Sequence, residues 1–132
     1  MATKGNTLLS KGIPQLEDAF VIIVKTEWNA HIIDKLEAGC KKVLKANGVK
    51  SKTIVVPGAF EIPFAIKAFY DGKVKSKADA FVALATVIRG DTPHFDYVCK
   101  GITDGIVQLN LMLKVPNACK DHRHIMLITE LY

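Results

Sequence analysis

The segment from Gly90 to His94 carries the groups best suited to chemistry. Gly90, Asp91 and Thr92 offer backbone N–H groups and a hydroxyl directly before a predicted helix. Such groups at a helix N-terminus bind phosphate, although a turn with a capping threonine is the simpler interpretation of this fragment alone. His94 follows in the first turn of that helix. The positive end of a helix favours neutral imidazole, which can accept a proton; an ordinary surface histidine is the alternative.

Two further segments offer groups that could bind an organic ligand. Phe60 and Glu61 stand at the start of another predicted helix, where the carboxylate could accept hydrogen bonds from ligand hydroxyls. Simple capping of the helix is the alternative interpretation of Glu61. Trp28, the single tryptophan, could stack on a planar heterocycle. A partly buried core position is the more ordinary interpretation of a tryptophan.

The sequence does not indicate a metal site. Cys119, His122 and His124 lie close together, but a zinc site needs four ligands, or three with an open position. The glycine-rich nucleotide fingerprints are absent as well. We therefore expect neither a metal nor a nucleotide cofactor.

The elements that must position these residues alternate between strand and helix. Continuous apolar runs predict buried strands at residues 19–24, 53–56 and 80–85. Helical spacing predicts one helix capped by Asn29 and ending at Gly48, and a second from about Ala59 to Tyr70. A third is predicted with Thr92 as N-cap and Pro93 at its first position. Its glycines at 101 and 105 are spaced for close packing against another helix.

This β-α-β-α-β-α order predicts a parallel sheet with helices on both faces and right-handed crossovers. Ligands bind such sheets at the carboxyl ends of the strands. Three predicted loops lie at that edge, at residues 26–29, 57–62 and 86–94. The chemistry-bearing residues named above belong to these loops, so we expect one site.

The composition fits one globular domain over residues 1–132, with residues 1–18 as a loose arm. The net charge is +5, but only two of the 18 basic residues are arginine and the lysines are scattered. That pattern argues against nucleic acid binding. No apolar run reaches the roughly 20 residues of a membrane span. No secretory signal is readable, and the three cysteines cannot all pair. We therefore expect a cytoplasmic protein with no membrane partner.

The three loops closely resemble those of lumazine synthase. The resemblance rests on EWN (27–29), VPGAFEIP (56–63) and VIRGDTPHFDYV (87–98), and runs from about residue 18 to Pro116. It implies a flavodoxin-like three-layer α/β/α sandwich with a four-stranded parallel sheet. It also implies condensation of 5-amino-6-(D-ribitylamino)uracil with 3,4-dihydroxy-2-butanone 4-phosphate, without cofactor or metal. The products are 6,7-dimethyl-8-ribityllumazine, phosphate and water.

The resemblance assigns roles to particular residues. His94 would transfer protons, and the phosphate would lie on Gly90, Asp91 and Thr92. The ribityl pyrimidine would contact Trp28, Asn29, Ala59, Phe60, Glu61, Thr86, Val87 and Ile88. Family members assemble as pentamers, in many cases closing into icosahedral shells, with active sites between subunits. Homo-oligomers and riboflavin synthase are therefore the macromolecular partners that the resemblance implies.

The chain departs from the family pattern after Pro116. Residues 117–132 form a divergent tail, Cys119 stands where the family has an aromatic residue, and the family's C-terminal helices are missing. The apolar run 125–129 could supply the fourth strand, and Lys120 or Arg123 could then lie near the phosphate. If the run frays instead, it exposes an apolar sheet edge that favours aggregation. A weakly active or inactive member that keeps ligand binding or a shell role is the alternative function. A riboflavin synthase of the same fold fits the loops less well.

Overall fold

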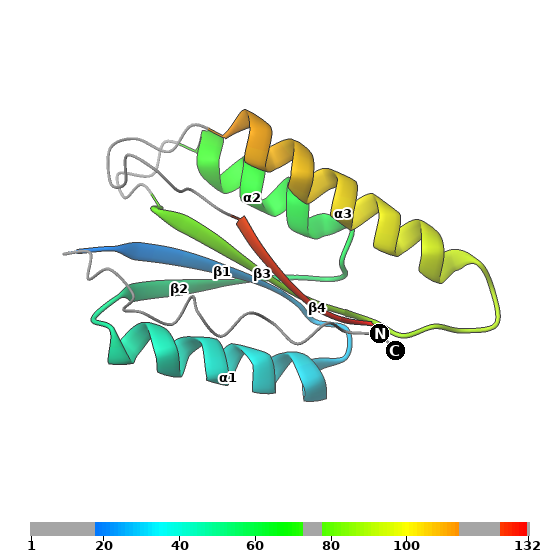
Figure 1. Ribbon diagram of the computed structural model, residues 1–132, viewed down its shortest axis with the longest axis horizontal. Helices are drawn as coiled ribbons and strands as arrows, with labels where there is room; N and C mark the ends of the chain where they lie inside the picture. Colours follow the sequence, from blue (N-terminus) through cyan, green and yellow to red (C-terminus); the bar gives the residue numbers. More distant parts are fainter. Residues whose placement is uncertain (1–17, 73–77, 114–124, 132) are drawn as a thin grey trace, which may run out of the picture.

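The computed structural model describes residues 18–72 and 78–113 and the backbone of 125–131 (Figure 1). The elements follow the order β1 (Phe20–Thr26), α1 (Ala30–Ala46), β2 (Lys50–Val56), α2 (Glu61–Asp71), β3 (Ala80–Val87), α3 (His94–Met112) and β4 (Ile125–Leu131). The arm at 1–17 and the tail residues Cys119, Lys120, His122, Arg123 and His124 lie outside the described residues.

The four strands form one parallel sheet in the order β2-β1-β3-β4. Strand β1 pairs with β2 from Phe20↔Lys50 onward and with β3 from Val21↔Ala80 onward. Strand β4 pairs with β3, which confirms the expected fourth strand. The two inner strands are thus β1 and β3, and their carboxyl ends lie at the centre of the sheet edge where we expect the site.

Helices cover both faces of the sheet, so the molecule has three layers (Figure 1). Helix α1 packs on one face, where Ile33 joins Ile23 and Leu84 in a small buried cluster. Helices α2 and α3 pack on the other face over a larger cluster that includes Phe81, Ile62 and Ile102. Burial on both faces explains why β1 is apolar without alternation from Val21 to Val24. The flavodoxin-like α/β/α prediction is confirmed.

Helix α1 ends as its sequence predicts. Gly48 has φ +70°, the left-handed conformation that glycine adopts without steric penalty. Its N–H donates to the Lys45 carbonyl at 3.1 Å, and the Val49 N–H donates to the Leu44 carbonyl at 3.0 Å. These two bonds form a Schellman motif, which satisfies the last carbonyls of the helix.

The predicted start of α3 is wrong by one residue. Its N-cap is Pro93 and its first residue is His94, whereas the sequence predicted Thr92 as N-cap. The reason is that the Pro93 carbonyl accepts the first helical hydrogen bond, from the Asp96 N–H at 3.0 Å. Helix α2 likewise begins at Glu61 rather than near Ala59. Both shifts leave the short turns before these helices as part of the site.

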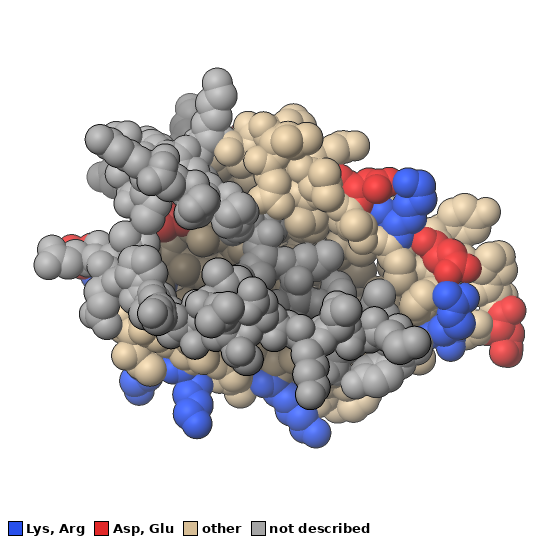
Figure 2. All heavy atoms as spheres, viewed as in Figure 1, with Lys and Arg blue, Asp and Glu red and all other residues tan. Residues whose placement is uncertain are grey.

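Within residues 18–72 and 78–113, no helix is both long and apolar enough to cross a membrane. Figure 2 shows basic side chains along the lower edge, where α1 lies in Figure 1, and alternating acidic and basic side chains toward α3. Two ion pairs involve residues of α3: Arg89 pairs with Asp96, and Lys100 pairs with Asp104. On the visible face, the cations near α3 are therefore offset by neighbouring carboxylates.

Candidate active site

A pocket of about 470 Å³ lies at the carboxyl ends of β1, β2 and β3. The first turns of α2 and α3 close its other side. Its wall combines backbone, aromatic and small polar groups from the three loops. The lining residues are Thr26, Trp28, Asn29, Pro57, Gly58, Ala59, Phe60, Glu61, Thr86, Val87, Ile88, Gly90, Thr92, His94, Phe95 and Val98.

The pocket brings together the predicted site residues from all three loops. All of them line it except Asp91, which is exposed beside it. Three lining residues that no prediction assigned to the site, Thr26, Pro57 and Gly58, lie inside the predicted loops. The other two, Phe95 and Val98, belong to α3 and lie outside the predicted loops. Phe95 follows His94 directly and Val98 lies one turn after it on the same helix face, and this spacing was the signal that they also reach the pocket.

Backbone and side-chain hydrogen bonds join the first loop to the other two. The N–H groups of Glu27 and Trp28 donate to the carbonyls of Val56 (2.8 Å) and Pro57 (3.3 Å). The Asn29 Nδ2 donates to the Thr86 carbonyl at 3.2 Å. Because these bonds cross between the ends of β1, β2 and β3, the three loops form one hydrogen-bonded rim.

Asn29 therefore differs from its predicted role. It occupies the N-cap position of α1, but its side chain makes no capping hydrogen bond, and its backbone is left-handed with φ 59°. Asparagine tolerates this conformation better than most residues do. The left-handed turn leaves the amide free to bond to the end of β3, where it holds two sides of the pocket together.

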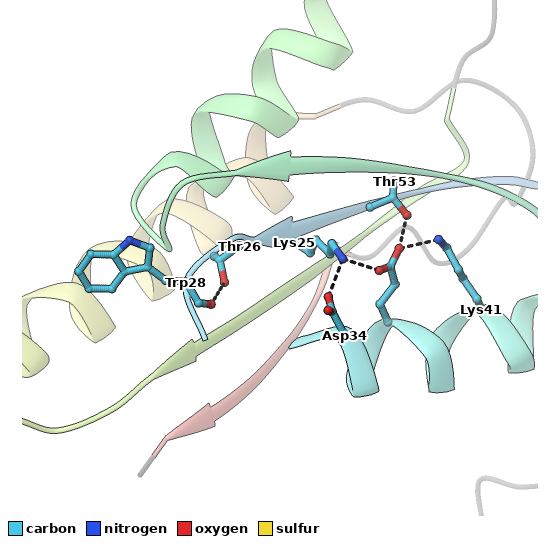
Figure 3. A network of polar contacts seen from close by, with 7 residues as sticks. Lys25, Thr26, Trp28, Asp34, Lys41 and Thr53 are labelled. Atoms are coloured by element: carbon cyan, nitrogen blue, oxygen red, sulfur yellow. Dashed lines mark hydrogen bonds and ion pairs between the residues drawn. The ribbon is translucent and has the colours of Figure 1, made fainter. Parts of the chain in front are cut away.

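Trp28 is exposed, contrary to the partly buried alternative. Its exposed fraction is 75%, and that of Phe60, across the rim, is 52%. The Thr26 hydroxyl donates to the Trp28 carbonyl at 3.1 Å and so fixes the turn that presents the indole (Figure 3). Exposed aromatic rings at a pocket mouth offer flat apolar surfaces to a planar ligand.

Glu61 makes the capping contact and still faces the pocket. One carboxylate oxygen, Oε2, accepts a hydrogen bond from the Gly58 N–H at 3.0 Å. This bond closes the turn before α2, and the negative charge lies favourably at the start of the helix. A carboxylate can accept about four hydrogen bonds, so the exposed Glu61 keeps capacity for ligand hydroxyls. The capping and binding interpretations of Glu61 are compatible.

The loop before α3 is closed by Arg89. Its Nη2 and Nη1 donate to the two carboxylate oxygens of Asp96 at 2.8 and 3.4 Å. The guanidinium carbon also lies 4.1 Å from the centre of the Phe95 ring. These contacts join the start of the loop to the first turn of α3. Gly90, Thr92 and His94 are thereby held at the N-terminal end of the helix, where all three line the pocket.

A polar network supports the first loop from the α1 side of the sheet (Figure 3). Lys25 forms ion pairs with Asp34 at 2.8 Å and Glu37 at 2.6 Å, and Lys41 pairs with Glu37 at 2.5 Å. The Thr53 hydroxyl donates to Glu37 at 2.6 Å. Burial disfavours the charged carboxylate, but these hydrogen bonds outweigh it and lower the pKa of Glu37 to about 2. The network links α1 to β1 and β2, and its Lys25 directly precedes Thr26, the first residue of the loop that carries Trp28.

The site offers positioned hydrogen-bonding groups rather than a metal centre. Among the described residues, no group of three His, Cys, Asp or Glu side chains could hold a metal ion. The lining contributes one carboxylate, on Glu61, and one imidazole, on His94. Such an arrangement can bind hydroxyls and a planar ring, and it can bring an anion to a helix N-terminus beside a proton carrier.

Comparison with known proteins identifies close sequence relatives. The sequence model of the 6,7-dimethyl-8-ribityllumazine synthase family matches residues 18–119. A 6,7-dimethyl-8-ribityllumazine synthase from Parabacteroides distasonis is 45% identical over 107 residues, covering 79% of this chain and 65% of that protein. Enzymes of the same name from Bacteroides fragilis and Phocaeicola vulgatus are each 44% identical, over 71% and 79% of this chain and 66% and 62% of their own lengths. The matched region thus spans just under two thirds of these relatives.

Proposed function

The chain belongs to the 6,7-dimethyl-8-ribityllumazine synthase family, and we propose that it is a transferase that catalyses this family's reaction in riboflavin biosynthesis. The substrates are 5-amino-6-(D-ribitylamino)uracil and 3,4-dihydroxy-2-butanone 4-phosphate. The observation that carries the proposal is the pocket itself. It gathers residues from the three separated motifs that resemble the family.

The pocket suits the ribityl pyrimidine along one half of its wall. The pyrimidine ring stacks on the exposed indole of Trp28, beside Asn29 and the chain from Thr86 to Ile88. The ribityl hydroxyls bond to Glu61 and to the chain at Ala59 and Phe60. This placement uses the free hydrogen-bonding capacity of Glu61 and the backbone groups at the ends of β2 and β3.

The phosphate of the second substrate binds at the N-terminal end of α3. The N–H groups of Gly90 and Thr92 and the Thr92 hydroxyl contact it. Asp91 contributes through its backbone, since its carboxylate would repel the phosphate. This places the ketone of the sugar phosphate between the pyrimidine amine and His94.

The reaction then proceeds by positioned condensation. The 5-amino group attacks the ketone and water leaves, which forms an imine. Loss of phosphate follows, and attack by the ribitylamino nitrogen closes the ring with loss of a second water. His94 moves the protons that these steps require. Most of the acceleration comes from holding two substrates in contact, and His94 adds a general acid–base contribution of about 10² to 10⁴.

The test mixes the purified chain with both substrates and follows lumazine formation by absorbance. We expect turnover, and we expect His94→Ala to lower kcat by about 10² to 10⁴ with an unchanged unfolding midpoint. His31→Ala is the matched control, because His31 is an exposed histidine of α1 outside the pocket. Equal rates for the two variants would refute the role of His94.

The same experiment distinguishes an active enzyme from the alternative function. A chain that binds the ribityl pyrimidine without turnover would be a binding or shell component rather than a working enzyme. Native mass spectrometry run alongside shows whether the protein forms the pentamer or the larger shell expected of the family.

We further propose a single lumazine-synthase-like domain, a cytoplasmic location and riboflavin synthase as a partner. If no product forms at saturating substrate concentrations, the catalytic proposal is wrong.

A further inference from the structure

Two glycines of α3 lie against the first turn of α2 at the pocket wall. Gly101 and Gly105 are one helical turn apart, on the helix face that carries His94 and Val98 into the pocket. A Cβ atom added at Gly101 would lie 2.4 Å from Cε1 of Phe60. One added at Gly105 would lie 2.7 Å from Cγ of Pro63. The two glycines therefore form a notch that receives the two rings at the start of α2.

At Gly101, the closest neighbour of an added Cβ is the Phe60 ring. The three atoms nearest to an added Cβ all belong to the Phe60 ring: Cε1 at 2.4 Å, Cζ at 3.2 Å and Cδ1 at 3.3 Å. One edge of this pocket-lining ring thus faces the α carbon of Gly101. Ordinary contact with a Cβ begins near 3.4 Å. A side chain at 101 would therefore displace the ring by about 1 Å, or would move the helix instead.

The ring is the part of this contact that can yield. Phe60 is 52% exposed and stands outside the main buried cluster, whereas Ala59 and Ile62 on either side of it belong to that cluster or pack against it. Helix α3 is anchored to the cluster by Ile102 and Ile106, which are both buried. A clash at 101 should therefore move the Phe60 side chain and leave both helices in place.

Helix propensity offers no reason for glycine at this position. Glycine in the interior of a helix is less favourable than alanine, so a contact is the physical reason to have it there. The same chain provides the contrast: Gly39, inside α1, has no atom within 4 Å of an added Cβ. Gly39 therefore has room for a side chain, whereas Gly101 has none because the Phe60 ring occupies that space.

We propose that Gly101 is a positioning residue that sets the Phe60 ring in the wall of the ribityl pyrimidine site. It acts on the substrate through Phe60 and makes no contact of its own. The inference rests on the proposed function for the identity of the ligand. The part of the inference that concerns the protein alone, namely that Gly101 sets the position of the Phe60 ring, does not depend on the identity of the ligand.

The experiment compares Gly101→Ala with Gly39→Ala by calorimetric titration of 6,7-dimethyl-8-ribityllumazine. We expect Gly101→Ala to weaken binding by up to about tenfold, the effect of losing one aromatic contact with the ligand. In the steady state, KM for the ribityl pyrimidine should rise more than KM for the sugar phosphate. Gly39→Ala should bind within twofold of the parent protein, because nothing is displaced. Equal binding by the two variants would overturn the inference.

A second pair of variants tests the route through Phe60. Phe60→Leu removes the atoms that meet the added Cβ most closely, Cε1 and Cζ. In that background, Gly101→Ala should change binding by less than twofold. An undiminished loss would show that Gly101 acts elsewhere, and the proposal would fail.

A structural readout keeps the inference distinct from the proposed function. A crystal structure of ligand-free Gly101→Ala should show the Phe60 ring moved and the backbone of α2 and α3 unchanged. If the parent protein binds no lumazine, the proposed function fails, and this structure still decides the coupling. If the ring stays in place and the helices separate instead, the positioning role is refuted.

Discussion

At the scale of single residues, Glu37 concentrates more polar contacts than any pocket residue described above. Its carboxylate accepts from Lys25, Lys41 and Thr53, and its side chain is only 12% exposed (Figure 3). Three elements thus meet at one charge, because these partners lie on β1, α1 and β2. Removing that charge would leave two lysine ammonium groups without their shared partner.

Glu37 makes stability depend on pH in the acidic range. Its pKa falls from 4.5 to about 2 on folding, so the native state favours the ionised form. The stabilisation is complete above pH 4.5 and is lost as the pH falls toward 2. Allowing for screening by water, we expect about 1–2 kcal/mol of the free energy of unfolding to be involved.

The measurement is urea unfolding of the parent protein and Glu37→Gln at pH 7 and pH 3. The variant should be less stable at pH 7, and the difference should shrink at pH 3. Asp34→Asn is the control, since Asp34 shares Lys25 but its side chain is 61% exposed, and it should change stability by under about 0.5 kcal/mol. A pH-independent difference for Glu37→Gln would contradict the assigned cause.

At the scale of elements, the helices owe their ends to backbone conformation more than to side-chain caps. The N-cap residues of α1, α2 and α3, which are Asn29, Phe60 and Pro93, make no side-chain cap hydrogen bond. Phe60 and Pro93 carry no side-chain acceptor, and the Asn29 amide donates to the Thr86 carbonyl instead. At its C-terminus, helix α1 is capped by the Schellman motif at Gly48.

Gly48 and Gly39 should respond to alanine in opposite directions. Both have open space around an added Cβ. Gly48→Ala forces a side chain into the left-handed conformation and should destabilise the protein by about 1 kcal/mol. Gly39→Ala, inside the helix, should stabilise it by about 0.5–1 kcal/mol. Thermal unfolding of both variants gives the signs directly, and a stabilised Gly48→Ala would contradict the motif.

At the scale of the whole molecule, the two faces of the sheet carry unequal shares of the core. The α2 and α3 face holds the larger cluster, in which Phe81 is 2% exposed. Its ring meets that of Phe69 edge to face at 5.9 Å. Phe81 lies on β3, an inner strand paired on both sides. Phe81 thus belongs to a strand of the sheet and packs with its side chain in the cluster under α2 and α3.

Phe81→Ala should therefore destabilise the fold far more than the loss of an exposed phenylalanine. We expect a loss of about 3–5 kcal/mol, from lost transfer energy and the cavity left behind. Phe64→Ala is matched in chemistry but 75% exposed, and it should change stability by under about 0.5 kcal/mol. Chemical denaturation of both variants measures the difference. Similar losses for the two would mean that the core does not depend on Phe81.

The amino-acid sequence determined the layers and the place of the site. Apolar strands alternating with amphipathic helices allow a parallel sheet covered on both faces, and that order brings the three loops to one edge. This is why Trp28, Glu61 and His94, far apart in the chain, could be assigned to one pocket. These features follow from local periodicity, which the sequence displays directly.

Only the tertiary structure decided how the loops are held. The Asn29 amide bonds to Thr86, 57 residues away, and an added Cβ at Gly101 would meet Phe60. Such partners depend on the register of the strands and the approach of the helices, which short sequence patterns do not specify. The local sequence pattern thus determines the helices and strands, and the long-range contacts determine the geometry of the pocket on which binding depends.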